Sequence, residues 1–504
     1  MRRTPRLLVV LGVSAALMTL LPIGYLAIRL LQGWEAAVAE ILRPRTLELL
    51  ANTGLLVISV SLSALVIGFS QAWLVSRSNI RFASFFAILA TIPLAIPSYV
   101  MALGYISVFP GFSGFGASWL VLTLATSPLV FLAVTAALAR LDSAGEEVAR
   151  SLGQGKWQVL VSVTWPQVRP AATASSLLVA LYVLGEFGAI ALLRYDTFTR
   201  AIYNAYRGSF DRTSAAALAV VLLAITLLVI WFERRYRGSY VQSSRSLSKR
   251  VRVELGGWKI PATILLVAVG GLSALLPISS LVSWSIAGTS KIDWSVLLAA
   301  LWGSVQLAVA AGLVIGLFGT AIALWSIRYQ SRLGKLIENL SWAIHAIPAV
   351  VVGLALVFFG ANLTPWIYQT SWLLLIAYLI LFLPNALAGL ATPIAQVPVM
   401  LEEVSQSLGT PSSKSLFKVV LPIALPGLVA AVALVSLTVL KELPATLLLR
   451  PTEVNTLATR LWGATEDLAY SQAAPYALLL VIIAGLPALA LNAQARKALS
   501  EVLG

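Results

Sequence analysis

The chain is a succession of long apolar runs separated by short polar segments. Most runs are 20 residues or longer, which is the length of helix that crosses the hydrocarbon core of a bilayer. They lie near residues 7–31, 50–75, 83–108, 118–140, 171–193, 214–232, 260–284, 303–326, 340–360, 372–395, 427–449 and 473–492. The pattern predicts an all-α polytopic membrane protein with about twelve transmembrane helices.

Composition supports the same fold class. Hydrophobic residues make up 59% of the chain and charged residues 11%, whereas soluble globular proteins carry about a quarter charged residues. A net charge of +15 would indicate nucleic acid in a soluble protein, but membrane proteins collect basic residues in their cytoplasmic loops. We therefore expect membrane lipid and no nucleic acid as a partner. The absence of cysteine and the single histidine, His345, exclude thiolate and multi-histidine metal sites.

The basic residues also predict the orientation. The N-terminus resembles a signal peptide, but its apolar run continues to about Leu31 without a small-residue cleavage site, so we expect an uncleaved first span. With this end inside, the inward segments, counting Arg140 at the edge of one, hold 24 of the 35 Lys and Arg residues and the outward segments hold ten. Both termini are therefore predicted to be cytoplasmic.

A polar loop occurs twice at a constant offset of 256 residues. Residues 146–153 read EEVARSLG, residues 402–409 read EEVSQSLG, and Pro166 and Pro422 follow at the same distance. The same offset relates Pro128 to Pro384, Glu186 to Glu442 and Arg194 to Arg450, and an offset of 251 relates Pro97 to Pro348. The chain therefore contains an internal repeat.

The predicted spans divide evenly between the two copies of this repeat. Each half has an even number of spans, so both halves enter the membrane the same way round, as parallel repeats related by an axis along the membrane normal. We predict a first repeat at residues 1–232, a basic cytoplasmic linker at 233–259 and a second repeat at 260–504.

Each copy of the loop has the signals of two short helices joined by a tight turn. In the first copy, Glu146 and Glu147 fall in the first turn of a helix, where carboxylates suit the helix dipole. Gly153 follows where a left-handed turn needs glycine, and Pro166 and Pro170 are expected to end the second helix before the fifth span. One such loop alone would be an ordinary amphipathic surface segment. Two copies with the same spacing favour two equivalent docking sites for one kind of partner.

The repeated loop resembles the signature of the permease subunits of binding-protein-dependent ABC importers. This EAA motif has Glu-Ala-Ala, three residues, Gly, nine residues and then Ile-x-Leu-Pro. The positions that fit it are Glu147, Gly153, Val163, Pro166, Glu403, Gly409, Val419, Leu421 and Pro422, and the departures are Val148, Trp165, Val404 and Ser405. The resemblance covers both halves and implies a fused permease of the type I importer fold, in the bacterial inner membrane.

The resemblance also implies what the loops bind. In the family, the loop inserts into a groove on the ATP-hydrolysing subunit and transmits its closure, which implies an interface role for Glu147 and Glu403 and a turn role for Gly153 and Gly409. The chain has no Gly-x4-Gly-Lys-Ser/Thr phosphate loop, so it is expected to be a transport subunit and not an enzyme, with no cofactor of its own. ATP is then used by a separate subunit, in two copies per chain.

Charged residues within a span are costly, so Glu186, Lys441 and Glu442 need a role. One interpretation is local, with Glu442 neutralised nearby and Glu186 paired with an arginine such as Arg194. The other places Glu186 and Glu442 on the central passage, as transient metal ligands whose oxygens suit a hard cation. Two carboxylates make no tight ferric site, which fits a passage because a strong site would trap the ion.

The segments around these carboxylates resemble the ferric-iron branch of fused permeases. They are residues 186–189, 194–203, 441–446 and 458–462. The resemblance implies uptake of Fe(III) from a periplasmic ferric-binding protein by ATP-driven alternating access. The alternatives are the same importer class with thiamine or a polyamine as cargo, a secondary transporter, and a membrane scaffold without transport activity. Among these classes, we expect only the importer to co-purify with an ATPase.

Overall fold

The structure, a computed structural model, describes residues 4–141, 144–207, 212–237, 253–288, 292–344 and 347–485. Within these ranges nine helices are long and apolar enough to cross a membrane, and a pair of helices bent by 97° makes a tenth candidate. Two shorter apolar helices, Ala349–Asn362 and Tyr470–Gly485, fall in the two predicted ranges that remain. The prediction of an all-α polytopic protein is confirmed. His345 and most of the predicted linker lie outside the described residues.

The chain divides into two compact units, which do not coincide with the sequence halves. The first unit comprises Met1–Glu40, Ala205–Leu223 and Ile292–Gly463, and the second comprises Ile41–Asn204, Ala224–Lys291 and Ala464–Gly504. The helix that opens the chain thus joins the core of the second half, and the helices that open the second half join the core of the first. The repeat boundaries drawn from the sequence stay a prediction.

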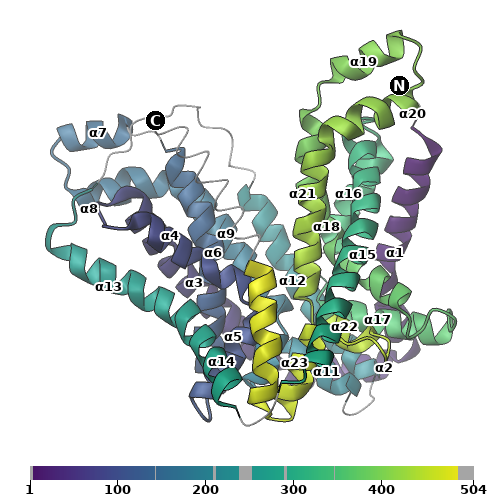
Figure 1. Cartoon of the computed structure of the whole chain (residues 1–504), viewed down its shortest axis with the longest axis horizontal. Helices are drawn as coiled ribbons and strands as arrows, with labels where there is room; N and C mark the ends of the chain where they lie inside the picture. The colour runs from purple at the N-terminus through teal and green to yellow at the C-terminus, as the bar shows by residue number, and fades with distance from the viewer. Residues whose placement is uncertain are drawn as a thin grey trace. The chain divides into compact units, whose positions relative to one another are not determined.

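The second unit is built on three long helices that pack on one another, α3, α6 and α9 (Figure 1). Their bounds are Pro44–Arg77 for α3, Gly114–Ala139 for α6 and Trp165–Gly185 for α9. A Cβ atom on Gly68 of α3 would lie 2.7 Å from the backbone oxygen of Ser127 in α6. Glycine therefore permits the close approach of these two helices, as small residues do between membrane helices.

The bent pair of the second unit carries the prolines of the third span. α4 (Ala83–Thr91) and the 3₁₀ turn η1 (Ile92–Ala95) lead to α5 (Ser98–Val108), and Pro97 precedes the first residue of α5. The broken helix α13 (Lys259–Gly270), η4 (Gly271–Leu275) and α14 (Leu276–Ala287) packs against α4 and α5. Tyr105 of α5 donates a hydrogen bond from its hydroxyl to the carbonyl of Leu272, with an O···O distance of 3.0 Å.

The first unit repeats the three-helix core with α15, α18 and α21, which also pack on one another (Figure 1). Their bounds are Trp294–Ile327, Ser371–Gln396 and Leu421–Leu440. Gly319 of α15 is the counterpart of Gly68 at an offset of 251, and a Cβ atom there would lie 2.8 Å from Leu390 of α18. Against this core pack α1 (Arg6–Gln32), α16 (Arg332–Ile344) and α17 (Ala349–Asn362).

The other helices are short or connect these cores. Outside the candidate site they are α2 (Trp34–Ile41), α11 (Phe198–Arg207), α12 (Arg212–Arg237), the 3₁₀ turn η3 (Gly256–Trp258) and α23 (Leu457–Glu466). α12 is divided between the two units, because its residues up to Leu223 belong to the first and the rest to the second.

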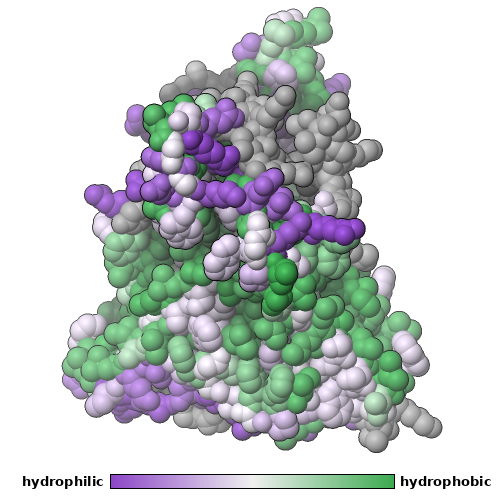
Figure 2. Space-filling model, turned by 90° about the vertical axis from the view of Figure 1, so that its left-hand side faces the viewer, coloured by the Kyte–Doolittle hydropathy of each residue, from purple (hydrophilic) through white to green (hydrophobic). Residues whose placement is uncertain are grey.

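Apolar side chains are exposed on the helices predicted to meet lipid. On the face drawn in Figure 2 they form a broad band with hydrophilic side chains above and below it. On α13, Ile260 is 72% exposed and Ile264 is 61% exposed. In water such a surface would be unfavourable, whereas in a bilayer it contacts hydrocarbon.

Candidate functional site

The first copy of the repeated loop folds as two helices joined at Gly153. α7 (Ala144–Ser151) ends before this glycine, whose φ of +82° lies in the left-handed region, where residues with a Cβ atom are strained. α8 (Lys156–Val159) then continues through the π-helical turn η2 (Leu160–Thr164) directly into α9. The predicted turn geometry at Gly153 is therefore present.

The predicted helix end at Pro166 and Pro170 is wrong, and Pro170 lies inside α9. Pro166 lies in the first turn of α9, and residues 156–185 form one continuous helical stretch. The turn η2 before the proline is wider than an α-helical turn, and such π-bulges occur within helices without ending them. The second copy shows the same arrangement, because η5 (Leu416–Val420) precedes Pro422 in α21.

The two neighbouring glutamates of the first loop have different surroundings. Glu146 is only 4% exposed, whereas Glu147 faces solvent. The hydroxyl of Thr164 donates to Oε1 of Glu146 at 2.8 Å, and Nη1 of Arg77 lies 3.5 Å from Oε2. Glu146 therefore fixes α7 to the membrane helices, and Glu147 is the carboxylate that a partner is able to reach.

The second loop separates its glutamates in the same way. Its helices are α19 (Val399–Ser407) and α20 (Ser412–Ser415), and Gly409 between them has a φ of +87°. Glu402 is 1% exposed and accepts a hydrogen bond from Nε2 of Gln406 at 3.3 Å, whereas Glu403 is exposed. Each loop thus has one buried and one accessible carboxylate.

Both loops also expose apolar side chains at equivalent positions. The pairs are Val148 and Val404, Leu152 and Leu408, and Val161 and Phe417, with Trp157 as an addition in the first loop. Leu152 is 76% exposed and Leu408 is 81% exposed. Exposed apolar side chains grouped beside a charged residue are typical of a protein interaction surface. The surface formed in each loop by the exposed glutamate and these apolar side chains is called the docking surface below.

The other repeated feature is a glutamate at the end of the fifth span. Glu186 follows α9 and precedes the short helix α10 (Gly188–Leu192), and Glu442 precedes α22 (Pro444–Leu449). Oε1 of Glu186 accepts a hydrogen bond from the backbone N–H of Ala189 at 3.0 Å, as Oε1 of Glu442 does from that of Ala445 at 2.7 Å. Both carboxylates therefore cap the first turn of a short helix.

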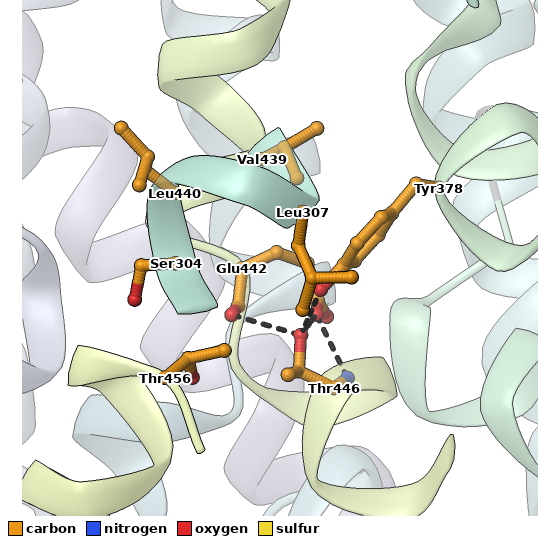
Figure 3. A pocket seen from close by; sticks show the side chains of 8 residues that line it. All are labelled: Ser304, Leu307, Tyr378, Val439, Leu440, Glu442, Thr446 and Thr456. Atoms are coloured by element: carbon orange, nitrogen blue, oxygen red, sulfur yellow. Dashed lines mark hydrogen bonds between the residues drawn. The ribbon is translucent and has the colours of Figure 1, made fainter. Parts of the chain in front are cut away.

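Glu442 has a more extensive polar network than this one bond. Its Oε2 accepts a hydrogen bond from the backbone N–H of Thr446 at 2.9 Å and another from the Thr446 hydroxyl, which also lies 2.7 Å from the hydroxyl of Tyr378 (Figure 3). These residues line a cavity of about 10 Å³ together with Ser304 and Thr456. A polar cavity of that size has room for about one water molecule.

The structure places the two glutamates in different units, Glu186 in the second and Glu442 in the first, and their role in a passage stays a prediction. The ion pairs among the described residues do not join Glu186 to Arg194. The backbone N–H of Ala189 donates a hydrogen bond to the Glu186 carboxylate instead. Among the residues that the structure describes, no three or more His, Cys, Asp and Glu residues are grouped as a metal would require.

The sequence analysis did not identify two arginines that bind the chain beside each loop, Arg77 and Arg328. Both lie at the end of the second span of their half, and they are related by the offset of 251 that relates Pro97 to Pro348. This repetition was the available signal. Their partners are far away in sequence, so the contacts themselves are visible only in the fold.

Comparison with known proteins identifies the family. The family described as "Binding-protein-dependent transport system inner membrane component" matches residues 64–237 and 308–497. The chain belongs to this family. One match falls in each half, which confirms the prediction of a fused permease in which one chain carries the repeat twice. The permease is an integral inner-membrane protein.

Several named relatives are similar to the permease. The "Fe(3+)-transport system permease protein FbpB 2" of Haemophilus influenzae is 36% identical over 504 aligned residues, covering 98% of this chain and 100% of the relative. The "Ferric transport system permease protein FbpB" of Actinobacillus pleuropneumoniae is 23% identical, covering 84% of this chain and 68% of that protein. The "Sulfate transport system permease protein CysT" of Escherichia coli is 28% identical over 43% of this chain and 85% of its own length.

Proposed function

We propose that the permease moves Fe(III), delivered by a periplasmic ferric-binding protein, into the cytoplasm. The observation that carries this proposal is the similarity to the Haemophilus influenzae protein named for Fe(3+) transport, at 36% identity over 98% of this chain. The alignment therefore includes nearly all of both halves of this chain. Relatives that align with less than half of this chain support the importer class more strongly than they support a cargo.

The two docking surfaces receive two copies of an ATP-hydrolysing subunit, one on each loop. Glu147 and Glu403 are exposed beside apolar side chains, which suits a partner with an apolar groove and a cationic or N–H donor group at its edge. Both loops, the N-terminus and the C-terminus then lie on the cytoplasmic side. Closure of the ATPase pair moves the loops, and the helices alternate between outward-facing and inward-facing states.

Glu186 and Glu442 contribute transient ligands along the passage. Each carboxylate is held in place by backbone N–H groups, so its oxygens are oriented before an ion arrives. Carboxylate oxygens suit hard cations, and so few of them bind weakly enough to release the ion. Selectivity for iron then resides in the binding protein.

Similarity to anion permeases supports a second candidate cargo. Besides the sulfate permease, a "Putative 2-aminoethylphosphonate transport system permease protein PhnV" of Salmonella paratyphi A is 32% identical over 34% of this chain. An oxyanion is therefore the second candidate, ahead of thiamine or a polyamine.

Reconstitution with the ATPase and the binding protein tests the cargo. Proteoliposomes are supplied with radiolabelled Fe(III), sulfate, 2-aminoethylphosphonate, thiamine or a polyamine, and uptake is measured with and without ATP. Uptake of Fe(III) that needs both ATP and the binding protein is expected. Uptake of another cargo in its place overturns the iron assignment, and uptake driven by an ion gradient without ATP overturns the importer mechanism.

A double variant tests the docking role. Replacing Glu147 and Glu403 by alanine should abolish most ATP-driven transport and leave insertion into the membrane intact. Glu48→Ala, which removes an exposed glutamate at the start of α3, is the matched control. Normal coupling in the double variant would count decisively against docking through these loops.

A further inference from the structure

A buried arginine ties the first loop to the membrane helices of its unit. Arg77 is the last residue of α3 and is 4% exposed. Its Nη2 donates a hydrogen bond to the carbonyl of Leu138 at the end of α6, at 3.4 Å, while Nη1 lies 3.5 Å from Glu146 of α7. One guanidinium thus joins the second span, the fourth span and the first helix of the loop.

The first unit has an arginine at the equivalent place. Arg328 directly follows α15, and its Nη2 donates hydrogen bonds to the carbonyls of Ile394 and Val397, both at 2.6 Å. Ile394 is the counterpart of Leu138 at the offset of 256. Val397 lies just before α19. In both units an arginine from the second span therefore binds the backbone from which the loop departs.

A second tie joins the end of the second span to the second helix of each loop. In the second unit, Nζ of Lys156 donates to the carbonyl of Glu254 at 2.6 Å, and the neighbouring Val253 donates its N–H to the carbonyl of Arg77 at 2.7 Å. In the first unit, the hydroxyls of Tyr329 and Ser412 lie 3.3 Å apart. Lys156 and Ser412 are equivalent at the offset of 256. In both units the second helix of the loop is therefore linked to the end of the second span, although different atoms make the bonds.

We infer that Arg77 and Arg328 are positioning residues that transmit the movement of each loop to the second span of its unit. The inference rests on the docking role proposed above. Arg77 is 4% exposed and Arg328 is partly buried, and each binds the backbone beside its loop, so displacement of the loop displaces the arginine and the helix that carries it. α3 and α15 pack closely on the fourth spans at Gly68 and Gly319. The displacement of the second span is therefore transmitted to the three-helix core, because the close packing leaves no room for that span to move alone.

Replacing each arginine by lysine tests the inference in the complete transporter, because lysine keeps the charge but not the planar guanidinium. At Arg77 two different nitrogens of this group contact Leu138 and Glu146, and at Arg328 its Nη2 bridges two carbonyls. In proteoliposomes, Arg77→Lys and Arg328→Lys should lower the substrate transported per ATP hydrolysed roughly 2- to 30-fold, the range found for residues in coupling networks. Co-purification of the ATPase should stay at the wild-type level. Arg140→Lys and Arg332→Lys, at exposed arginines near the same helix ends, are the matched controls.

A second measurement reports on the tie without depending on transport. The chain has no cysteine, so a spin label attached through Val148→Cys on α7 reports the motion of that helix alone. The label should become more mobile in Arg77→Lys and in Glu146→Gln, and it should be unchanged in Arg140→Lys. The double variant of Arg77 and Glu146 should be no more mobile than the worse single variant, because both changes break one connection.

These measurements separate failure of the inference from failure of the docking proposal. Wild-type stoichiometry in both lysine variants, or an immobile label in Arg77→Lys, overturns the inference. Loss of ATPase binding in the lysine variants overturns it as well, since the arginines would then shape the docking surface itself. If the wild-type protein binds no ATPase, the docking proposal fails, and the transmission role fails with it even if the spin label shows the tie.

Discussion

Glu442 and Ala445 form the same carboxylate-to-backbone hydrogen bond in the first unit that Glu186 and Ala189 form in the second, at 2.7 and 3.0 Å. Each bond lies where a long helix ends and a short helix begins. An acidic side chain at such a break satisfies backbone N–H groups that the bilayer core leaves without water. The glutamates therefore have a structural role that any role in cargo passage must coexist with.

Two substitutions at Glu442 separate these roles. Glu442→Gln keeps an oxygen that accepts the bond from Ala445 but removes the charge and turns an NH2 group toward the N–H of Thr446. Thermal stability should therefore fall less than in Glu442→Ala, while cation transport falls. Glu442→Ala leaves the N–H groups of Ala445 and Thr446 unpaired, and each buried unpaired group costs about 1–3 kcal/mol. Thermal unfolding in detergent and uptake in proteoliposomes measure the two effects.

The control for this pair is Glu453→Gln, a neutral replacement of an exposed glutamate in the same unit, which should change neither quantity. If Glu442→Gln transports Fe(III) at the wild-type rate, the carboxylate charge has no part in the passage and only the capping role is left.

Features that depend on near neighbours could be predicted from the sequence. The apolar runs predict the spans because a helix in lipid needs about 20 apolar residues whatever surrounds it. The turns at Gly153 and Gly409 are predictable because a left-handed turn after a helix favours glycine regardless of tertiary contacts. The offset of the internal repeat identifies Glu186 and Glu442 as equivalent positions.

Features that depend on long-range packing could not be predicted. Glu146 and Glu147 are adjacent and chemically identical, and only the fold, which brings Thr164 and the distant Arg77 to Glu146, makes the first a buried anchor. The continuation of the helix through Pro166 depends on the wide turn before it, for which the residues of η2 give no clear signal. The joining of α1 to α15 in one unit likewise leaves no local pattern in either helix.

The apolar part of the docking surface should matter as much as its charge. Leu408→Asp places a charge where an 81% exposed leucine is available for burial against a partner. Burying a leucine side chain contributes about 1.5–3 kcal/mol, so the affinity for the ATPase should fall roughly 10- to 100-fold. Ser413→Asp adds the same charge at an exposed position of the same loop and should bind normally. Equal losses in both variants would show a general charge effect in place of an apolar contact.

The glycine turns should be sensitive to a single methyl group. Gly409→Ala forces a residue with a Cβ atom to a φ of +87°, at a cost of about 1–2 kcal/mol. We expect faster hydrogen exchange in α19 and α20 and weaker ATPase binding, measured on the purified protein with and without its partner. Gly116→Ala, at an exposed helical glycine with open space around its Cβ position, should leave both unchanged. A Gly409 variant with wild-type exchange would mean that the turn tolerates a side chain.

The close approach of the second and fourth spans gives the sharpest packing test, since one helix offers both the variant and its control. In Gly68→Ala the new Cβ atom would lie 2.7 Å from the backbone oxygen of Ser127 and from Cβ of Val130. Backbone atoms do not move aside easily, so stability should fall by about 1–3 kcal/mol, as for other overpacked cores. Gly54→Ala, also in α3, meets nothing within 4 Å and should be neutral or slightly stabilising, because alanine has the higher helix propensity. Thermal unfolding in detergent compares the two, and equal stability would mean that α3 and α6 lie further apart than the structure has them.

If Gly68→Ala also lowers the transport obtained per ATP in protein that remains folded, the contact between α3 and α6 carries the movement that Arg77 receives from the loop.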